Sequence, residues 1–350
     1  MHAWKSPWWM DETFAQTFAN TVGWSVNLAI SPCSVRQNQS FGQRAMKPYS
    51  VCAGIVAHNP GPEGIGALVD RLSSCAEWVV VIDNHSSNTD YLQQFEGRSG
   101  IEVVRNTENG GVSIGINQII DYARAVRAKY VTAYDQDTQI PQGLVSKLAG
   151  DLDDLIHAGQ PAAAVGPLVI DDFTNHTLPF ISFRLPLNAR YRKGVGESRH
   201  LVECNFLISS GCLMSMAAIE EIGAMNEALF IDNVDLDWCF RATNKRYKIY
   251  GDFEGVIRQR IGDSCTQIPF TKSVVRYHNA KRNYYMTRNR FWLYRQAYVN
   301  GAWVIHDICR FSVKLLYLAL FHSDRVRFIK SSVRGIFDSF SIKPYEDSKA

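Results

Sequence analysis

The chain has 350 residues, of which 46% are hydrophobic and 12% aromatic, enough to build the core of one large domain or two small ones. This composition excludes a disordered chain, a collagen and a coiled coil. Eight cysteines are scattered without a close pair, which indicates reduced thiols in a cytoplasmic protein rather than a disulfide framework. The charge is uneven, because residues 272–350 hold 15 Lys/Arg against 5 Asp/Glu although the whole chain has a net charge of +3. A basic C-terminal part indicates a partner that carries phosphates, such as a nucleotide diphosphate, an anionic membrane or nucleic acid.

The first 47 residues differ in character from the rest of the chain. Their tryptophans follow no period, and a polar stretch runs from Ser34 to Gln43. No basic segment precedes a clean apolar one, so we do not expect a signal peptide. We interpret residues 1–47 as a poorly ordered or atypical N-terminal extension.

From residue 48 on, short apolar runs alternate with helical patterns, which is typical of a sheet with mostly parallel strands. The apolar runs predict strands at residues 51–57, 77–83, 101–105, 130–134 and 162–170. The helical patterns predict helices at residues 65–74, 113–127, 142–157 and 217–223. Neither an internal repeat nor a low-complexity linker interrupts the pattern. We therefore expect one α/β domain at residues 48–295 and a basic, amphipathic helical region at residues 296–350.

The segment Trp303–Phe321 comes nearest to a membrane-spanning helix, which needs about 20 apolar residues. Asp307, Arg310 and Lys314 interrupt it and share one arc of a helix with His306, while apolar residues occupy the other faces. The pattern predicts an amphipathic helix, not a span. Such a helix packs either on the core of its own domain or, helped by the basic residues that follow, on a membrane surface.

Two carboxylates, Asp135 and Asp137, follow the apolar strand predicted at residues 130–134. Ligands of open α/β sheets bind at the carboxyl ends of the strands. Mg²⁺ and Mn²⁺ take few protein carboxylates and share their other positions with substrate phosphates. The motif therefore indicates a metal-diphosphate site, although two acids in a turn can also be helix caps or part of a solvated loop.

Asp83 and Asn84 come directly after the strand predicted at residues 77–83. A carboxylate at the end of such a strand can accept hydrogen bonds from a ribose hydroxyl or a base N–H. An Asx-turn without a ligand explains the same residues equally well.

The segment Asn109, Gly110, Gly111, with Asn117 a little further on, forms a glycine-rich start of a helix. Free N–H groups and the helix dipole favour an anion at such a place. The spacing matches neither a dinucleotide-binding fingerprint nor a P-loop.

Three acids, Asp232, Asp235 and Asp237, come just before and within a predicted helix start that also contains Trp238. Asp235 would lie near the first turn, where a carboxylate can face a cavity or cap N–H groups. A carboxylate beside a crevice is a reasonable general base for a sugar hydroxyl. A capped, ion-paired helix is the alternative.

A basic segment follows, with His278, Arg282, Tyr285, Arg288 and Asn289 at spacings that bring several of them to one helix face. Guanidinium groups donate two parallel hydrogen bonds and suit a diphosphate. By itself the segment is equally compatible with RNA or with lipid head groups.

In this order the segments resemble family 2 glycosyltransferases of the GT-A fold, and within them the bacterial rhamnosyltransferases of O-antigen and cell-surface polysaccharide assembly. The resemblance covers about residues 50–295, and the joint order of its segments is more specific than any one of them. The segments are VCAGIVAHNP, VVVIDNHSSN, NGGVSIGIN, YVTAYDQDTQIP, SSGCLMS, FIDNVDLDWCFRA and YHNAKRNYYMTRNRFWL. The resemblance implies an α/β fold with a Rossmann-like, mixed and mostly parallel sheet flanked by helices, followed by a helical C-terminal appendage.

The resemblance also implies roles for single residues. Asp83 would contact the base of a nucleotide-sugar, and Asp135 with Asp137 would hold Mg²⁺ or Mn²⁺. Asp235 would be the catalytic base, but Val234 stands where many relatives have Glu, which leaves the choice between Asp235 and Asp237 open.

Further substrate contacts are expected from residues in several of these segments. The diphosphate would be held by His278, Arg282, Arg288 and Asn289. The acceptor would be bordered by Ser210, Gly211 and Cys212. The remaining residues assigned to substrate binding are Asn84, Asn109, Gly110, Gly111, Asn117, Asp237 and Trp238.

The activity implied is a single inverting displacement that moves L-rhamnose from dTDP-L-rhamnose to a glycan hydroxyl, the glycan being carried on a polyprenyl diphosphate. This acceptor would bring the basic C-terminal region to the cytoplasmic face of the cell membrane. A UDP-hexose or UDP-galactofuranose donor, or a non-catalytic protein that binds nucleotide-sugars, is the alternative. Nucleic-acid binding is disfavoured because it leaves the acidic motifs unexplained.

Overall fold

The computed structural model describes residues 49–61, 64–192, 200–260, 264–267, 274–277, 279–321 and 324–345. The expected N-terminal extension, residues 1–47, lies outside the described residues, and so does His278.

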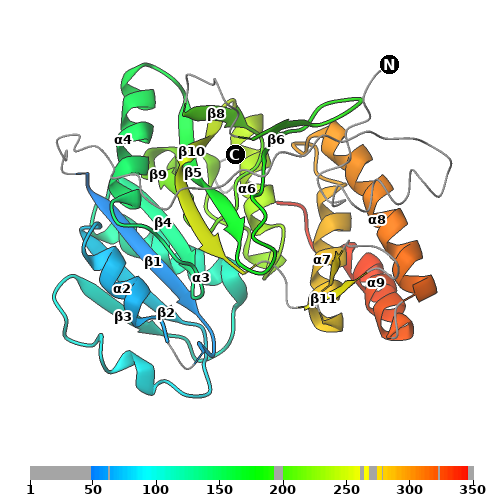
Figure 1. The fold of residues 1–350 in the computed structure, drawn as a ribbon, viewed down its shortest axis with the longest axis horizontal. Coiled ribbons are helices and arrows are strands. Elements are labelled where there is room, and N and C mark those ends of the chain that lie inside the picture. The colour runs from blue at the N-terminus through cyan, green and yellow to red at the C-terminus, as the bar shows by residue number, and fades with distance from the viewer. Residues whose placement is uncertain are drawn as a thin grey trace.

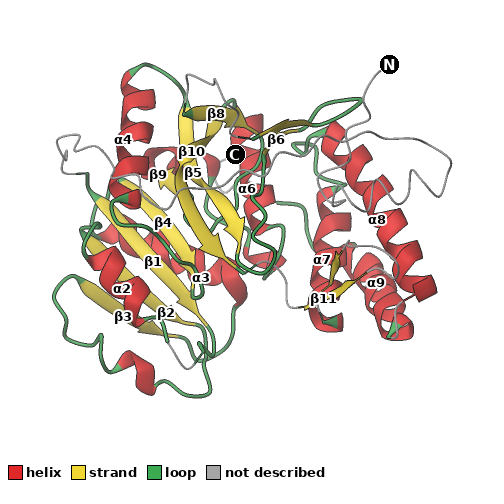
Figure 2. Cartoon of the chain, in the orientation of Figure 1, coloured by secondary structure: helices red, strands yellow, loops and turns green. Residues whose placement is uncertain are grey.

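An eight-stranded sheet forms the centre of the molecule (Figures 1 and 2). In spatial order its strands are β3 (Ile101–Arg105), β2 (Trp78–Asp83), β1 (Val51–Ala57), β4 (Tyr130–Asp135), β9 (Leu213–Ser215), β5 (Ala162–Asp171), β10 (Lys248–Gln259) and β8 (Leu201–Cys204). The pairs β1–β2, β1–β4, β2–β3 and β5–β10 are parallel. The short strands β9 and β8 run antiparallel to their neighbours. The mixed, mostly parallel sheet expected from the sequence is thus confirmed.

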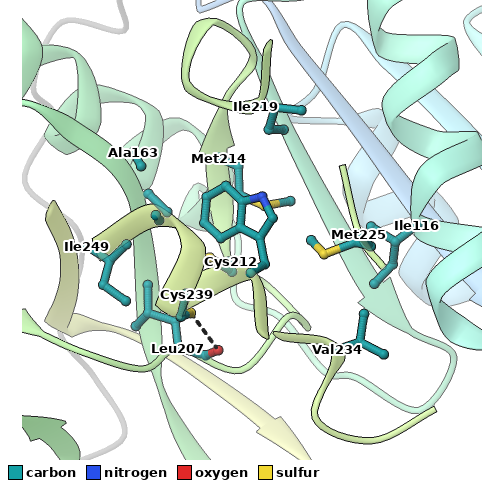
Figure 3. Packing of buried hydrophobic residues seen from close by; sticks show 14 of the residues in the cluster. Ile116, Ala163, Leu207, Cys212, Met214, Ile219, Met225, Val234, Cys239 and Ile249 are labelled. Atoms are coloured by element: carbon teal, nitrogen blue, oxygen red, sulfur yellow. Dashed lines mark hydrogen bonds between the residues drawn. The ribbon is translucent and has the colours of Figure 1, made fainter. Parts of the chain in front are cut away.

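Helices cover both faces of this sheet, which explains why its central strands are continuous apolar runs. The helices α2 (Gly66–Ser73) and α4 (Leu144–His157) pack on one face. The helices α3 (Gly111–Ala125), α5 (Met216–Ile222) and α6 (Val234–Asn244) pack on the other. Figure 3 shows the hydrophobic core between the sheet and α3, α5 and α6, where Cys239 of α6 donates a hydrogen bond to the carbonyl of Leu207.

Several short elements lie outside these layers. They are the ribbon of β6 (Phe180–Ser182) and β7 (Ala189–Tyr191), the ribbon of β11 (Ser264–Gln267) and β12 (Val274–Tyr277), and the 3₁₀ turns η1 (Asp90–Leu92) and η2 (Glu227–Leu229). The sequence analysis assigned most of these short elements to loops, because a strand of three or four residues shows too few alternations of apolar and polar side chains to be recognised.

Three helices, α7 (Ala280–Leu293), α8 (Gly301–Phe321) and α9 (Arg325–Ser339), stand together beside the α/β layers (Figure 1). The helices α7 and α9 approach closely at Gly335, where an added Cβ would lie 2.8 Å from the carbonyl oxygen of Tyr284. Asn283 of α7 donates to the hydroxyl of Ser332 at 3.0 Å. Small residues on α9 therefore set the spacing of the helix pair.

The charged arc of α8 faces inward, toward α7, and much of its apolar surface faces outward. Trp303 packs against the core, but Asp307 on the same side is only 1% exposed. On the outer side, Leu316 is 61% and Phe321 69% exposed. Charged as well as apolar side chains therefore attach this helix to its neighbours. None of the described helices combines the length and the apolar character that a membrane span requires.

Candidate active site

Carboxylates gather at one end of the sheet, where β1, β2 and β4 run side by side. Asp83 pairs in register with Ala57 of β1, and Asp135 pairs with Val56 of the same strand. The two carboxylates therefore stand on either side of β1 at the carboxyl ends of parallel strands, which is the usual position of a ligand site.

The side chain of Asp83 is buried and hydrogen-bonded within the protein. Its Oδ1 accepts a hydrogen bond from the hydroxyl of Tyr91 at 2.6 Å, and its Oδ2 accepts one from the backbone N–H of Ser86 at 3.2 Å. These donors fix the orientation of the carboxylate, and each oxygen retains a lone pair for a further donor.

Asp135 is poised to attract a cation. Burial, together with the neighbouring carboxylates of Asp137 and Asp232, raises its pKa to about 6, against the opposing effect of Arg282. A carboxyl whose charged form is disfavoured in this way gains most from a positive partner.

The chemistry of this turn fits a divalent cation. Two carboxylates, Asp135 and Asp137, leave most coordination positions for substrate phosphates and water, as Mg²⁺ and Mn²⁺ prefer. Within the described ranges, no group of three or more His, Cys, Asp or Glu side chains is arranged to hold a metal ion. Any cation bound here would therefore depend on oxygens that the substrate brings.

Ser210 and Gly211 support the turn that carries Asp135 and Asp137. The Ser210 hydroxyl accepts a hydrogen bond from the backbone N–H of Asp135 at 3.1 Å and lies 2.7 Å from the hydroxyl of Thr138. Gly211 donates to the carbonyl of Ala133 at 2.8 Å, with a φ of 79° that favours glycine. Ser210 is buried, and so is Cys212. These residues shape the floor of the site, and their contact with the acceptor stays a prediction.

Asp235 lies in the first turn of α6 and is half-buried. Its Oδ1 accepts a hydrogen bond from the backbone N–H of Leu236 at 2.8 Å. Burial raises the pKa of Asp235 to about 7, and the negative charges of Asp232 and Asp135 act in the same direction. A carboxylate with such a pKa is well suited to accept a proton near neutral pH.

Asp237 is fully buried, and each of its carboxylate oxygens accepts a hydrogen bond within the protein. Arg241 donates to its Oδ2 at 2.9 Å, and the hydroxyl of Tyr298 donates to its Oδ1 at 2.5 Å. Trp238 is likewise buried and donates to the carbonyl of Gly223 at 3.0 Å. Asp237 and Trp238 thus have partners within the protein, and their contact with substrate stays a prediction. Asp235 is the acid of this helix that lies near Asp135.

The segment before α6 has a strained backbone. Phe230, Asp232 and Asn233 all have φ between 61° and 63°, a region that non-glycine residues rarely adopt. The side-chain amide of Asn289 donates to the carbonyl oxygens of Ile231 at 2.7 Å and Asp232 at 2.8 Å, and also to that of Leu229 at 2.8 Å. We call residues 229–233 the clamped loop, because α7 holds it in this conformation.

The arginines of α7 also hold the clamped loop. Arg288 donates to the carbonyl of Ala228 at 2.8 Å and to the side chain of Asn289 at 3.0 Å. Arg282 forms an ion pair with Asp232, with its Nε 3.0 Å from a carboxylate oxygen. The expected diphosphate contacts of Arg288 and Asn289 are therefore replaced by contacts within the protein, whereas Arg282 lies close enough to Asp135 to lower its pKa.

The glycine-rich start of α3 packs against the clamped loop instead of remaining open for an anion. Gly111 has a φ of 84°, and an added Cβ would clash with the carbonyl oxygen of Phe230. That same oxygen accepts a hydrogen bond from the N–H of Ser113 at 3.3 Å. The Oδ1 of Asn84 accepts a hydrogen bond from the N–H of Gly110 at 3.1 Å. The N-terminus of α3 is thus engaged by protein atoms, and anion binding there stays a prediction.

Three asparagines predicted to contact substrate have structural partners. Asn84 donates to the side chain of Asn109 at 3.1 Å. The Nδ2 of Asn117 donates to the backbone carbonyl of Met225 at 3.0 Å, and its Oδ1 accepts a hydrogen bond from the backbone N–H of Met225 at 2.8 Å. All three hold loops in place around the site.

Sequence reasoning missed one functional partner, the pairing of Asp232 with Arg282. Both residues stand in the quoted motifs, but their pairing joins segments fifty positions apart, and no local pattern predicts it. A local signal did exist for the choice of base. Residues two positions apart on a helix point about 200° away from each other, so Asp235 and Asp237 cannot both face the same crevice.

Residues 53–223 match the family model described as "Glycosyl transferase family 2". This domain belongs to glycosyltransferase family 2. The glycosyltransferase is 26% identical over 297 residues to the "dTDP-rhamnosyl transferase RfbF" of Shigella flexneri, an alignment that covers 83% of this chain and 95% of the relative. It is 25% identical over 202 residues to the "Low-salt glycan biosynthesis hexosyltransferase Agl10" of Haloferax volcanii, covering 56% of this chain and 62% of the relative.

Among solved structures, the chain resembles GalNAc-T7, which was crystallised with UDP, GalNAc and Mn²⁺. The TM-score is 0.50 at 12% sequence identity, and the match covers 61% of this chain and 44% of that one. At this identity the similarity establishes the GT-A fold alone. The fold, the family and the enzyme class expected from the sequence are therefore confirmed.

Proposed function

We propose that this glycosyltransferase moves L-rhamnose from dTDP-L-rhamnose to a hydroxyl group of a glycan acceptor, with inversion at the anomeric carbon. The observation that carries the chemistry is the position of Asp235, a half-buried carboxylate with a raised pKa beside the Asp135 turn. The donor sugar is inferred from the similarity to the rhamnosyl transferase of Shigella flexneri over most of both chains.

In the proposed reaction, Asp235 accepts the proton of an acceptor hydroxyl as its oxygen attacks the anomeric carbon from the face opposite the nucleotide. The bond to the nucleoside diphosphate breaks in the same step, so no covalent enzyme intermediate forms. Its raised pKa makes Asp235 a stronger base than an ordinary carboxylate once it is ionised. From a β-linked donor, inversion yields an α-linked rhamnose.

Asp135 and Asp137 would hold Mg²⁺ or Mn²⁺, which neutralises the charge that develops on the leaving diphosphate. The relative in fold was crystallised with Mn²⁺ and UDP, which supports a divalent cation in this class of site. Arg282 is the cation of this chain best placed to assist, because it lies near Asp135. Asp83 would accept a hydrogen bond from the base of the donor.

The acceptor is proposed to be a glycan on a polyprenyl diphosphate at the inner face of the cell membrane, as in O-antigen synthesis. The outward-facing apolar residues of α8 and α9 support this, since Leu316, Leu320 and Phe337 are more than half exposed. Exposed basic residues on α9, such as Arg327 and Lys330, would meet anionic lipid head groups.

A calorimetric comparison of dTDP-L-rhamnose with UDP-galactose and UDP-glucose, each with and without Mn²⁺, tests the donor. We expect Mn²⁺-dependent binding of dTDP-L-rhamnose at least about tenfold tighter than of either UDP-sugar, a difference of about 1.4 kcal/mol. Tighter binding of a UDP-sugar would indicate the same mechanism with a hexose donor. The similarity to the Haloferax hexosyltransferase favours this alternative.

A further inference from the structure

A cluster of charged side chains lies between α7 and α8, away from the carboxyl ends of the strands. Arg290 of α7 donates to Asp307 of α8 at 2.5 Å, and Arg310 forms a second ion pair with the same carboxylate. The side chains of the two arginines are 14% and 11% exposed. Lys314 follows one turn later on the face of α8 that carries Asp307 and Arg310. We call Arg290, Arg310 and Lys314 the basic cluster.

Positive charge exceeds negative charge in this cluster. Its three cations surround a single carboxylate, that of Asp307, which already serves both arginines. Lys314 makes neither a hydrogen bond nor an ion pair with the described part of the chain. Burial, reinforced by repulsion from Arg290 and Arg310, lowers the pKa of Lys314 to about 8. No carboxylate in the described part of the chain forms an ion pair with this half-buried ammonium group, and an anionic ligand that formed one would stabilise its charged form.

The basic cluster adjoins the active site through the clamped loop. Arg290 directly follows Asn289, whose amide binds the carbonyl of Asp232. The carboxylate of Asp232 is close enough to oppose the lowering of the pKa values of Arg290 and Lys314. The cluster therefore borders the loop that leads into the catalytic helix, on the side of α8.

The position of the cluster favours the acceptor over the donor as its ligand. In the proposed function the donor diphosphate already has a cation at Asp135 and Asp137, together with Arg282. The cluster lies instead on α8, whose outer face exposes Ile308 and Leu316. An anionic group attached to a lipid would place its charge at the inner face of this helix and its hydrocarbon chain beside the outer one.

We propose that Arg290, Arg310 and Lys314 bind the phosphate of a lipid-linked acceptor, at a site separate from that of the donor diphosphate. This inference rests on the proposed function for the presence of a glycan acceptor, but its test requires no transfer of sugar. The same chemistry, a diphosphate, also occurs in the donor, and the experiment separates the two.

The probe is farnesyl diphosphate, a short prenyl diphosphate, titrated into the full-length protein saturated with dTDP. We expect Lys314→Met to weaken its binding by roughly tenfold, because a charge-assisted hydrogen bond to phosphate is lost. Lys343→Met, which removes an exposed cation from the segment after α9, is the matched control and should change binding less than about twofold. Lys314→Arg should retain most of the affinity, and farnesol should bind all variants equally.

Thermal unfolding shows whether Lys314 has only a structural role. Because its charge lacks a partner, Lys314→Met should leave the melting temperature unchanged or raise it. A lower melting temperature together with unchanged farnesyl diphosphate binding would overturn the proposal. Absence of farnesyl diphosphate binding by the wild type would also overturn it.

Titration of dTDP alone distinguishes the donor from the acceptor. An equal loss of dTDP affinity in Lys314→Met would assign the basic cluster to the donor and refute a separate acceptor site. If the protein fails to bind dTDP-L-rhamnose but still binds farnesyl diphosphate through Lys314, the proposed donor is refuted and the proposed phosphate site is supported.

Discussion

At the scale of single residues, the two acids of α6 have opposite roles although only Leu236 separates them. Asp235 borders the site with a raised pKa, whereas Asp237 is enclosed by Arg241 and Tyr298. In the proposed function, the same chemical group therefore serves catalysis in one position and stability in the other, and substitutions should separate the two.

Asp235→Asn should lower the rate of rhamnose transfer by at least about 100-fold, because a general base of this kind contributes 10²–10⁴-fold. Binding of dTDP-L-rhamnose, measured by calorimetry, should change less than about twofold. In the wild type, kcat/KM should rise with pH through about 7 as Asp235 ionises. Full activity of the variant would eliminate Asp235 as the base.

The pKa of Asp235 also predicts a pH dependence of stability. The folded protein holds this proton up to about pH 7, whereas the unfolded chain releases it near 3.8, the ordinary pKa of an aspartate. Between these values the folded state binds more protons, so this group's contribution to stability falls as pH rises from about 4 to 7. Urea unfolding without metal should show Asp235→Asn gaining stability relative to the wild type between pH 5 and pH 8.

Asp237→Asn should instead destabilise the fold, because it leaves the buried guanidinium of Arg241 without its counter-charge. Loss of one partner of a buried ion pair typically costs about 3–5 kcal/mol. The free energy of unfolding in urea measures this loss, and a change below about 1 kcal/mol would contradict the buried pair.

At the scale of elements, α7 acts as a support for the clamped loop. One amide, that of Asn289, satisfies three carbonyl oxygens of a segment whose φ values are unfavourable. Without these bonds the loop would relax toward ordinary backbone conformations, and Asp235 would lose its position.

Asn289→Ala should therefore lower kcat by about 10- to 100-fold, in line with the sensitivity of catalysis to small displacements. Mn²⁺-dependent binding of dTDP should persist, because Asp83 and Asp135 stand on strands that α7 does not support. Asn300→Ala, which removes an amide near the start of α8 instead, is the control. Equal losses in both variants would show that the clamp has no special role.

The predicted strands, and the order of the motifs that follow them, were correct because the strands of a parallel sheet are continuous apolar runs. Such runs can be recognised in a single sequence. The base was left between Asp235 and Asp237 because the burial of Asp237 depends on tertiary packing, and one of its partners, Tyr298, stands 61 positions away. The same limit applied to Asn289, whose helix face was correctly predicted. The atoms it would meet are backbone carbonyls, which no side-chain pattern reveals.

At the scale of the whole molecule, the C-terminal helices turn apolar side chains outward. Exposed residues recur along one stripe of α9, from Val326 through Val333 to Phe337 and Phe340. Exposed apolar surface flanked by basic residues is typical of a membrane-surface helix.

Sedimentation with vesicles tests this surface. The protein should bind vesicles that contain phosphatidylglycerol more tightly than neutral phosphatidylcholine vesicles, and added salt should weaken the binding. Phe337→Ser combined with Phe340→Ser should reduce vesicle binding by at least about tenfold and leave dTDP binding intact. Release of a dimer by the same substitutions, without any loss of vesicle binding, would identify the stripe as a contact between two copies.

Because α7 holds the clamped loop, it also limits where this enzyme can be cut into fragments and in which order its parts can fold during synthesis. The family match ends at residue 223, before the proposed base, and the amide that fixes the loop lies a further 66 positions along the chain. During synthesis, the strands that carry Asp83 and Asp135 can form before α7 is available to hold the clamped loop beside Asp235. The growing chain should therefore hold nucleotide before it can transfer sugar, and catalytic competence arrives only when the last helices emerge.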